Sequence, residues 1–547
     1  MLRPEPIGAI PEETVRVARA AFRKGSLAMR LRDELGTLYT NADFADLYPN
    51  LGQPALSPWR LALVTVLQFL ENLTDRQVAD QVRGRVDWKY ALGLDLTDPG
   101  FDRSVLSEFR TRLTQNQAEA RLLDRMLEHF QTKGLIRARG HQRTDSTHVL
   151  AAVRRLQRLE SAAEMVRAAL NALSGADPEW VRRVAQPEWF ERYGHRVEDY
   201  RLPKGKATRE AYGLAVATDG FTLLDALNGE GTPEGLRRLP MIKVFEQWWA
   251  QNFIREEGRI RWRRGDELAP SGERFNSPYD AEAAYSTRRE HEWIGYKVHI
   301  SETCDAELPH LITHVHTTNS TIQDVTSTAP IHAALAQRNL LPEKHIVDAG
   351  YIDAELLASS VPEHGVNLIG PTRENRSWQA RAGTGYAASH FQIDWDHCQV
   401  TCPQGATTRG WYPTVNRFGT LEILIQFDRE VCAACAVRSL CTKAKGGRRV
   451  VIQPREKHEA LRLAREYATS QEWQALYHRR AGIEGTLSQG TRALGLRRTR
   501  YRGLRKTALQ HAATCAAINV LRAVSWLNGD KPGRTRVSRF SQLAVSA

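Results

Sequence analysis

The chain has 547 residues, too many for a single hydrophobic core, and we expect three or four structural units. Charged residues make up 25% of the chain and apolar residues 42%, which is typical of a globular rather than a disordered protein. No apolar run is long enough to span a bilayer, and the N-terminus lacks the pattern of a signal peptide. The seven cysteines are odd in number and unevenly spaced, unlike a secreted disulfide framework. We therefore expect a cytoplasmic protein.

The positive charge is concentrated near the C-terminus. Between Gly485 and Ala547 there are twelve Lys or Arg and a single acid, Asp530, which accounts for +11 of the total net charge of +13. Such a local field favours a polyanionic partner and a salt-sensitive affinity. A solvated basic tail is the alternative, but Tyr501 and Gly503 have little reason to lie within a purely solubilising run.

Residues 1–140 are predicted to form a helical domain. Ser57-Pro58 indicates a helix start, Thr74-Asp75 can cap a second helix, and Asp102 or Ser104 can cap a third. Short capped helices with arginines on their polar faces resemble a helix-turn-helix DNA-binding module. A helical packing domain with ordinary surface arginines is the alternative. The arginines concerned are Arg76, Arg83, Arg85, Arg103, Arg110 and Arg112.

Residues 141–371 are predicted to form the first part of an α/β domain with a helical insertion at about 151–290. From Trp293 onward apolar residues recur with period two, which predicts a strand, and a second strand follows Pro309. Asp324 can cap a helix that runs to Leu335. Ile346-Val347-Asp348 and residues 366–369 predict two further short strands, so Asp348 would lie at a strand end, where ligands bind in such sheets.

Residues 372–454 are predicted to form a β-rich insertion, with strands at 391–400, 421–427 and 449–452. Residues 455–547 are predicted to be helical and basic. Thr469-Ser-Gln-Glu472 matches a capping box that would open a helix over 470–493.

Three carboxylates, Asp145, Asp348 and Glu484, are the candidate ligands of a shared Mg²⁺ or Mn²⁺ site. Such a trio can hold two divalent ions that activate the attacking oxygen and stabilise the leaving oxygen of a phosphodiester. Taken alone, Asp348 could simply cap a turn, and Asp145 is equally ambiguous.

The predicted helix over 470–493 favours the functional interpretation. Tyr477, Arg480 and Glu484 follow each other at helical spacing and would share one face. Gly482 and Gly485 each cost about 1 kcal/mol of helix propensity relative to Ala. We therefore expect the backbone there to lie close to something, either the sheet or a sugar-phosphate chain.

The cysteines of the β-rich insertion allow two interpretations. Four of them could form a structural zinc site, since Cys-x₂-Cys is a common zinc-binding turn, or they could be reduced structural thiols. These cysteines are Cys402, Cys432, Cys435 and Cys441.

Five motifs together resemble the insertion-sequence transposases of the DDE, RNase H-like class, and most closely the insertion-sequence family numbered 1182. They are Arg-Thr-Asp145-Ser-Thr-His, Trp293-Ile-Gly-Tyr-Lys-Val-His, Val-Asp348-Ala-Gly-Tyr, Tyr477-His-Arg-Arg480-Ala-Gly-Ile-Glu484-Gly and the basic run from Gly495 to Thr507. An N-terminal segment at about 45–125 also resembles the helical transposase domain.

The resemblance implies an RNase H-like mixed sheet with Asp145 on its first strand, Asp348 on its fourth and Glu484 on a late helix. A β-strand insertion between the second Asp and the Glu is also implied. The related signature continues from the Glu to a Lys, but this chain has Thr491 there, and we infer that the adjacent Arg492 makes the phosphate contact instead.

The sequence thus predicts a transposase that cuts double-stranded DNA at the ends of its element and joins it to target DNA, acting as a homodimer or larger synaptic complex. Tyr477 and Arg480 would position the phosphate beside Glu484. An inactive or domesticated DNA-binding protein, or a nuclease that cuts without joining, are the alternatives. The residues expected to contact the DNA backbone are Arg492, Arg497, Arg498, Arg500, Arg505 and Lys506.

Overall fold

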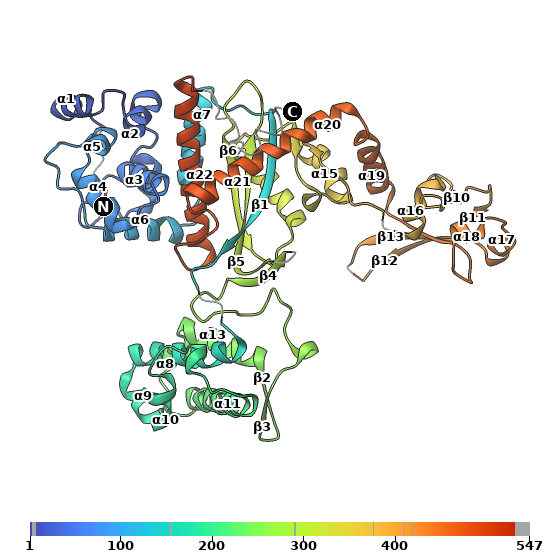
Figure 1. The fold of residues 1–547 in the computed structure, drawn as a ribbon, viewed down its shortest axis with the longest axis horizontal. Helices are drawn as coiled ribbons and strands as arrows, with labels where there is room; N and C mark the ends of the chain where they lie inside the picture. The colour runs from blue at the N-terminus through green and yellow to red at the C-terminus, as the bar shows by residue number, and fades with distance from the viewer. Residues whose placement is uncertain are drawn as a thin grey trace, which may run out of the picture.

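The computed structural model arranges three peripheral units around a central mixed sheet (Figure 1). It describes residues 1–2, 7–153, 156–288, 291–375, 377–408, 410–417 and 419–530. Four residues of the basic C-terminal run lie outside the described residues: Lys531, Arg534, Arg536 and Arg539. No helix in the described ranges is long and apolar enough to cross a membrane.

The N-terminal unit is helical, as predicted. Ser57 precedes a proline at the first position of α3, and Thr74 forms a capping box with Gln77 at the start of α4. The α-helices are α1 (Glu12–Ala21), α2 (Leu27–Arg30), α3 (Pro58–Leu70), α4 (Asp75–Gly84), α5 (Val86–Leu92), α6 (Ser104–Gln115) and α7 (Arg121–Thr132), with a π-helix at Leu31–Leu35 and a 3₁₀ turn at Ala42–Leu47.

The central sheet has the strand order β4-β5-β1-β7-β8, and β6 pairs with the part of β5 that β4 leaves free. β1, β7 and β8 run parallel, whereas β5 is antiparallel to β1, β4 and β6. The helix α14 (Thr328–Gln337) connects β6 to β7, and α15 (Ala354–His364) makes the crossover from β7 to β8. The strands are β1 (His141–Leu150), β4 (Ala284–Arg288), β5 (His291–Thr303), β6 (Ile312–Asn319), β7 (Lys344–Ile346) and β8 (Asn367–Ile369).

The C-terminal helix α22 (Leu504–Leu527) joins the N-terminal helices to the sheet. It packs on α3, α6 and α7 on one side and on β6 on the other (Figure 1). Its buried Asn519 accepts a hydrogen bond from Ile312 N at 2.7 Å and donates one to Ile312 O at 2.8 Å, so it pairs with the backbone of an edge strand. The N-terminal helices therefore share one continuous hydrophobic core with the sheet.

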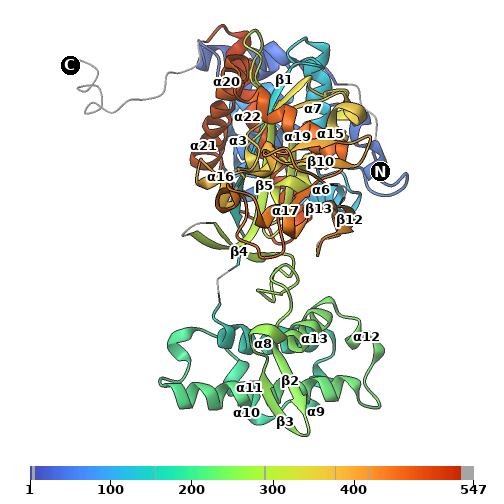
Figure 2. The same cartoon turned by 90° about the vertical axis from the view of Figure 1, so that its right-hand side faces the viewer.

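The helical insertion lies to one side of the sheet, beyond β4 (Figure 2). It has a separate core built around four buried tryptophans, Trp180, Trp189, Trp248 and Trp249. Its elements are α8 (Arg158–Ala176), α9 (Pro178–Val184), α10 (Pro187–Tyr193), α11 (Lys206–Asn228), α12 (Glu234–Arg237), α13 (Pro240–Asn252) and the hairpin of β2 (Phe253–Glu256) and β3 (Arg259–Trp262), with 3₁₀ turns at Asp199–Arg201 and Gly265–Glu267.

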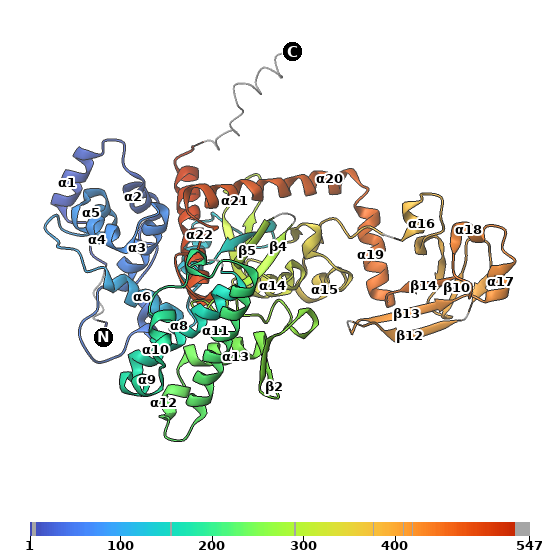
Figure 3. The ribbon, with the colours of Figure 1, turned by 60° about the horizontal axis from the view of Figure 1, so that its bottom comes forward.

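The β-rich insertion projects from the side of the sheet opposite the N-terminal helices (Figure 3). The single strand predicted over 391–400 is instead a hairpin, since residues 395–398 turn between β9 and β10 and Cys398 has a positive φ of 49°. The two other predicted strands are present. The insertion contains β9 (Gln392–Asp394), β10 (Gln399–Thr401), β11 (Thr407–Thr408), β12 (Trp411–Val415), β13 (Leu421–Gln426), β14 (Arg449–Ile452), α16 (Trp378–Arg381), α17 (Arg429–Ala433) and α18 (Arg438–Cys441), with a 3₁₀ turn at Ala388–His390.

The helix predicted over 470–493 is divided. After α19 (Arg455–Tyr467) the chain forms α20 (Gln471–His478), a 3₁₀ turn at Arg479–Ala481 and α21 (Gly482–Ala493). The N-cap is Ser470 rather than Thr469, and its side chain accepts a hydrogen bond from Trp473 N. The 3₁₀ turn is the point at which the helix passes over β1.

Asp324 does not cap α14, in contrast to the prediction. It begins a 3₁₀ turn, and its carboxylate instead pairs with Lys297 at 3.0 Å and accepts a hydrogen bond from Ser146 Oγ at 3.2 Å. The neighbouring strands provide stronger partners for this carboxylate than the free N–H groups of the helix.

Candidate active site

Asp145 and Asp348 lie side by side because of the register of two parallel strands. Arg143 on β1 faces Ile346 at the end of β7, and two further residues along each chain bring Asp145 level with Asp348. Since side chains alternate across a strand, Asp145 points to the same face as Arg143, whereas Thr144 points to the other face and bonds Ser301. Asp348 itself accepts a hydrogen bond from Gly350 N at 2.8 Å, which fixes the turn after β7.

Arg480 connects the first and third acids. Its Nη1 lies 2.8 Å from Asp145 Oδ2, and its Nη2 lies 3.2 Å from Glu484 Oε1. The Asp145 side chain is 13% exposed and that of Glu484 is 66% exposed, so the guanidinium joins a buried carboxylate to one at the surface. Of the three residues predicted to share one helix face, Arg480 and Glu484 are in contact, whereas Tyr477 lies on α20, before the 3₁₀ turn.

The surroundings of Asp145 disfavour the charged form of its carboxylate. Burial raises the pKa of Asp145, and the nearby Asp348 carboxylate raises it further, against the opposing effects of the Ser146 amide and Arg480. Burial also raises the pKa of Tyr477, which Arg480 lowers and Asp348 raises again. Two acids, a tyrosine and an arginine thus meet at one place, where a cation would relieve the repulsion between the acids.

The donor set fits a hard divalent cation, because Mg²⁺ and Mn²⁺ prefer carboxylate oxygens. In the described ranges, however, no three His, Cys, Asp or Glu side chains are close enough together to hold a metal ion in their present positions. Arg480 lies between Asp145 and Glu484 and provides the positive charge there.

Gly482 is close to the sheet, which is one of the two situations predicted for the glycines. A Cβ at this position would collide with the guanidinium of Arg143. Arg143 is buried, and it donates to Arg479 O at 2.5 Å and to Glu302 Oε1 at 2.7 Å. Gly485, by contrast, has open space where its Cβ would lie, so the surface beside Glu484 is unobstructed.

A buried charge cluster that the sequence analysis missed holds α21 against the sheet. Glu302 on β5 is fully buried. Its carboxylate pairs with Arg143 and accepts hydrogen bonds from Arg522 Nη1 at 2.7 Å and Thr486 Oγ1 at 2.6 Å. One signal was available in the sequence. Glu302 continues the alternating series of buried residues Tyr296, Val298 and Ile300, and an acid in that phase requires a buried partner.

The predicted DNA-binding residues divide into two groups. Three of them contact other parts of the protein: Arg497 Nε donates to Thr147 Oγ1 at 2.7 Å, Arg500 binds Leu73 O at 2.6 Å, and Arg505 pairs with Glu119 at 2.8 Å. Arg505 is nevertheless exposed at the surface. The others, Arg492, Arg498 and Lys506, are exposed as well.

The position of the missing signature lysine is turned away from solvent. Thr491 Oγ1 is buried and has no hydrogen-bond partner among the described residues, whereas the adjacent Arg492 is exposed. Of these two residues, only Arg492 is exposed to solvent.

Two protein-family models match the chain. Residues 18–112 match a transposase domain (DUF772), and residues 401–524 match a transposase DDE domain. The second range includes Glu484 but neither Asp145 nor Asp348. A search of curated proteins finds no match.

These matches support a transposase, an enzyme of the nuclease and transposase class whose partner is DNA. More narrowly, the two models together support an insertion-sequence transposase. Transposase DDE domains generally use divalent metal ions, in keeping with the carboxylates described above.

Proposed function

We propose that the protein cleaves DNA at the ends of an insertion sequence and transfers the freed ends to target DNA, and that it is most like the insertion-sequence family numbered 1182. The observation that carries the proposal is the contact of Arg480 with both Asp145 and Glu484, beside Asp348. Residues more than 300 positions apart thereby form one acidic site.

The fold proposed for this site is RNase H-like. Its support is the strand order β6-β5-β1-β7-β8, with three antiparallel strands followed by two parallel ones. Asp145 lies on β1, Asp348 follows β7, and Glu484 lies on α21. The β-rich insertion lies between the second acid and the third.

Asp145, Asp348 and Glu484 would hold Mg²⁺ or Mn²⁺, and divalent ions at such sites activate an attacking oxygen and stabilise a leaving oxygen. Arg480 would then release the two carboxylates and bind the phosphate, for which its planar guanidinium provides two parallel donors. Tyr477 would orient that phosphate beside Glu484. The same residues would serve both the cleavage step and the joining step.

DNA would be held by the exposed basic residues Arg492, Arg498 and Lys506, which give affinity rather than sequence choice. Arg497 and Arg505 lie beside them, although each also contacts another side chain. Recognition of the element ends falls to the N-terminal helices, where Arg76 and Arg83 are exposed. Joining two ends requires two active sites, so we propose a homodimer or larger synaptic complex in the cytoplasm, associated with the nucleoid.

The test uses the full-length protein, Mg²⁺ and DNA carrying the inverted repeats that flank its own coding region. We expect cleavage at the repeats and joined products, and both should be lost in Asp348→Asn while DNA binding persists. Asp266→Asn, at an exposed acid of the helical insertion, is the control and should retain full activity. Cleavage without joining would indicate a nuclease, and binding without cleavage an inactive DNA-binding protein.

A further inference from the structure

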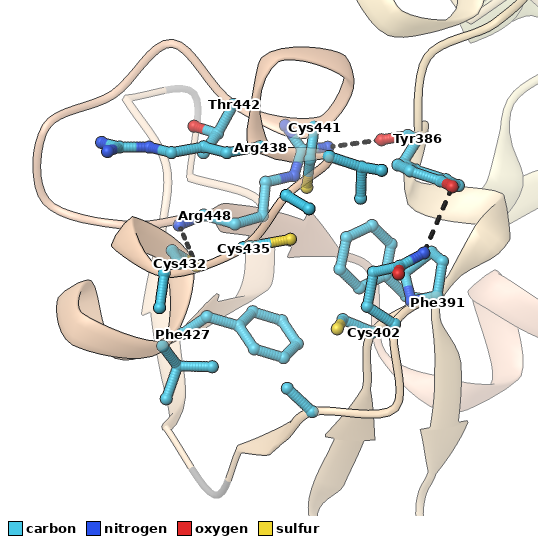
Figure 4. Close-up of a pocket in the computed structure, with 17 residues that line it drawn as sticks. Tyr386, Phe391, Cys402, Phe427, Cys432, Cys435, Arg438, Cys441, Thr442 and Arg448 are labelled. Carbon is cyan, nitrogen blue, oxygen red and sulfur yellow. Dashed lines mark hydrogen bonds between the residues drawn. The ribbon is translucent and has the colours of Figure 1, made fainter.

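The β-rich insertion brings four cysteines to one pocket. Cys402 comes from the turn between β10 and β11, Cys432 from α17, Cys435 from the segment after it, and Cys441 from α18. All four line a pocket of about 360 Å³, shown in Figure 4. All are free thiols in the structure, and none is fully exposed.

Cys402 lies in a tight turn between β10 and β11. Cys402-Pro403-Gln404-Gly405 is a tight reversal closed by the hydrogen bonds Gly405 N to Cys402 O at 2.9 Å and Cys402 N to Ala406 O at 2.8 Å. Gly405 has a φ of 82°, which only glycine adopts without strain. The turn thus presents the cysteine at the tip of a short hairpin.

Arg448 marks the pocket as a place for negative charge. Its Nε is buried and has no hydrogen-bond partner among the described residues, although it lies in the lining of the pocket. Its guanidinium reaches across the pocket to Tyr386 O at 3.4 Å (Figure 4), while its backbone N–H donates to Cys432 Sγ at 3.4 Å. A buried N–H donor without a partner is costly among neutral thiols, whereas a thiolate could accept a hydrogen bond from it.

The segment from 428 to 448 contributes none of the buried residues that form the hydrophobic core of the insertion. Its helices α17 and α18 have five and four residues, and neither contains a fully buried residue. The core of the insertion consists of seven buried residues, against which Cys402, Cys432 and Cys441 pack from the edge. Units with so small a core usually require a metal or disulfides.

We propose that Cys402, Cys432, Cys435 and Cys441 bind one structural Zn²⁺ as a tetrahedral four-thiolate site. Binding would release the thiol protons to solvent and leave a zinc–thiolate centre of net charge −2. The free Nε donor of Arg448 would face this centre, and the backbone N–H of Arg448 would donate a hydrogen bond to the Cys432 thiolate. The inference is independent of the proposed catalytic function.

The four sulfurs must approach each other for this site to form, since no described set of three metal-binding side chains is close enough at present. Rotation of a cysteine between staggered rotamers moves its sulfur by roughly 3 Å, and the pocket provides the space. In structural zinc sites, metal binding and folding of the surrounding chain usually occur together.

The experiment measures zinc per chain in untagged full-length protein, purified from zinc-supplemented cells without chelator. We expect about one zinc per chain. Cys402→Ser and Cys435→Ser should lose most of it, whereas Cys398→Ser, at an exposed cysteine outside the pocket, should retain it. Exchange for Co²⁺ should give the visible absorption of a tetrahedral thiolate site in the wild type and in Cys398→Ser.

Chelation provides a second measurement that does not depend on a variant folding. We expect removal of zinc to speed amide hydrogen exchange in residues 428–448 and to leave β1 and β5 unchanged. Wild-type protein that holds well below one zinc per chain, or a Cys435→Ser variant that retains the full amount, would overturn the proposal. Unchanged exchange after complete removal of the metal would do the same.

Discussion

Gly482→Ala tests whether the contact between α21 and β1 determines the position of Glu484. The backbone at Gly482 is helical, with φ −65° and ψ −25°, so alanine is not strained there. Its methyl group would nevertheless collide with the Arg143 guanidinium, which is held by Glu302 and by Arg479 O. Accommodation therefore requires α21 to move or Arg143 to give up a partner.

The free-energy costs of the Gly482→Ala collision can be compared with the gain in helix propensity. Loss of the Arg143 hydrogen bond to Arg479 O costs about 1.5–3 kcal/mol, and overpacking costs about 1–3 kcal/mol more. Higher helix propensity returns at most about 1 kcal/mol. We expect a net local destabilisation of about 2–5 kcal/mol. Gly485→Ala is the matched control, because its methyl group meets nothing and should stabilise α21 by about 0.5–1 kcal/mol.

Amide hydrogen exchange of the peptides spanning α21 is the suitable assay, since a chain with several cores does not unfold in one step. Exchange in Gly482→Ala should be at least tenfold faster, because each 1.4 kcal/mol or so is a factor of ten. Exchange in Gly485→Ala should be equal or slower. Similar protection in the two variants would show that Arg143 moves at little cost and that its contact with Gly482 does not fix the position of α21.

Three further changes test other contacts. Asp145→Asn removes a carboxylate whose pKa is raised by burial and by Asp348, so the metal-free variant should melt above the wild type at pH 7, with the difference vanishing as the pH falls to about 4. Asn519→Leu removes both bonds to Ile312 and should destabilise the contact between α22 and β6 by about 2–4 kcal/mol, seen as a lower urea midpoint for the amide-exchange protection of the β6 peptides. Arg498→Ala should reduce the slope of log DNA affinity against log salt by about 1 in anisotropy titrations, whereas Arg500→Ala should not. An unchanged melting temperature, an unchanged urea midpoint, or equal salt slopes would contradict these predictions in turn.

Local signals predicted the elements well where the pattern and the cap agreed. The helix cap at Thr74 and the strand predicted from Trp293 onward needed no tertiary information, and both are present in the structure. The strand predicted over 391–400 failed because two short β segments around a turn at Cys398 have the same composition as one longer strand.

The sequence indicated which residues form the candidate site better than it indicated how they are arranged in space. Spacing along one helix placed Arg480 beside Glu484, but only the pairing of β1 with β7 brings Asp145 level with Asp348. Arg500 is an example of a residue whose contacts the sequence did not indicate. Its neighbourhood looks like a polyanion-binding run, yet its guanidinium binds Leu73 O and packs on the Phe69 ring, and no local pattern distinguishes that use of an arginine.

The distribution of cores indicates which parts of the molecule can move together. The cluster that includes Leu67 of α3 also includes Val149 of β1 and Ile483 of α21, so the N-terminal helices and the acidic site belong to one packed body. Packed cores transmit displacement rather than absorbing it. A DNA end bound by the N-terminal helices would therefore lie at a fixed position relative to Asp145. The helical and β-rich insertions have cores of their own, so the packing of their interiors does not set that distance.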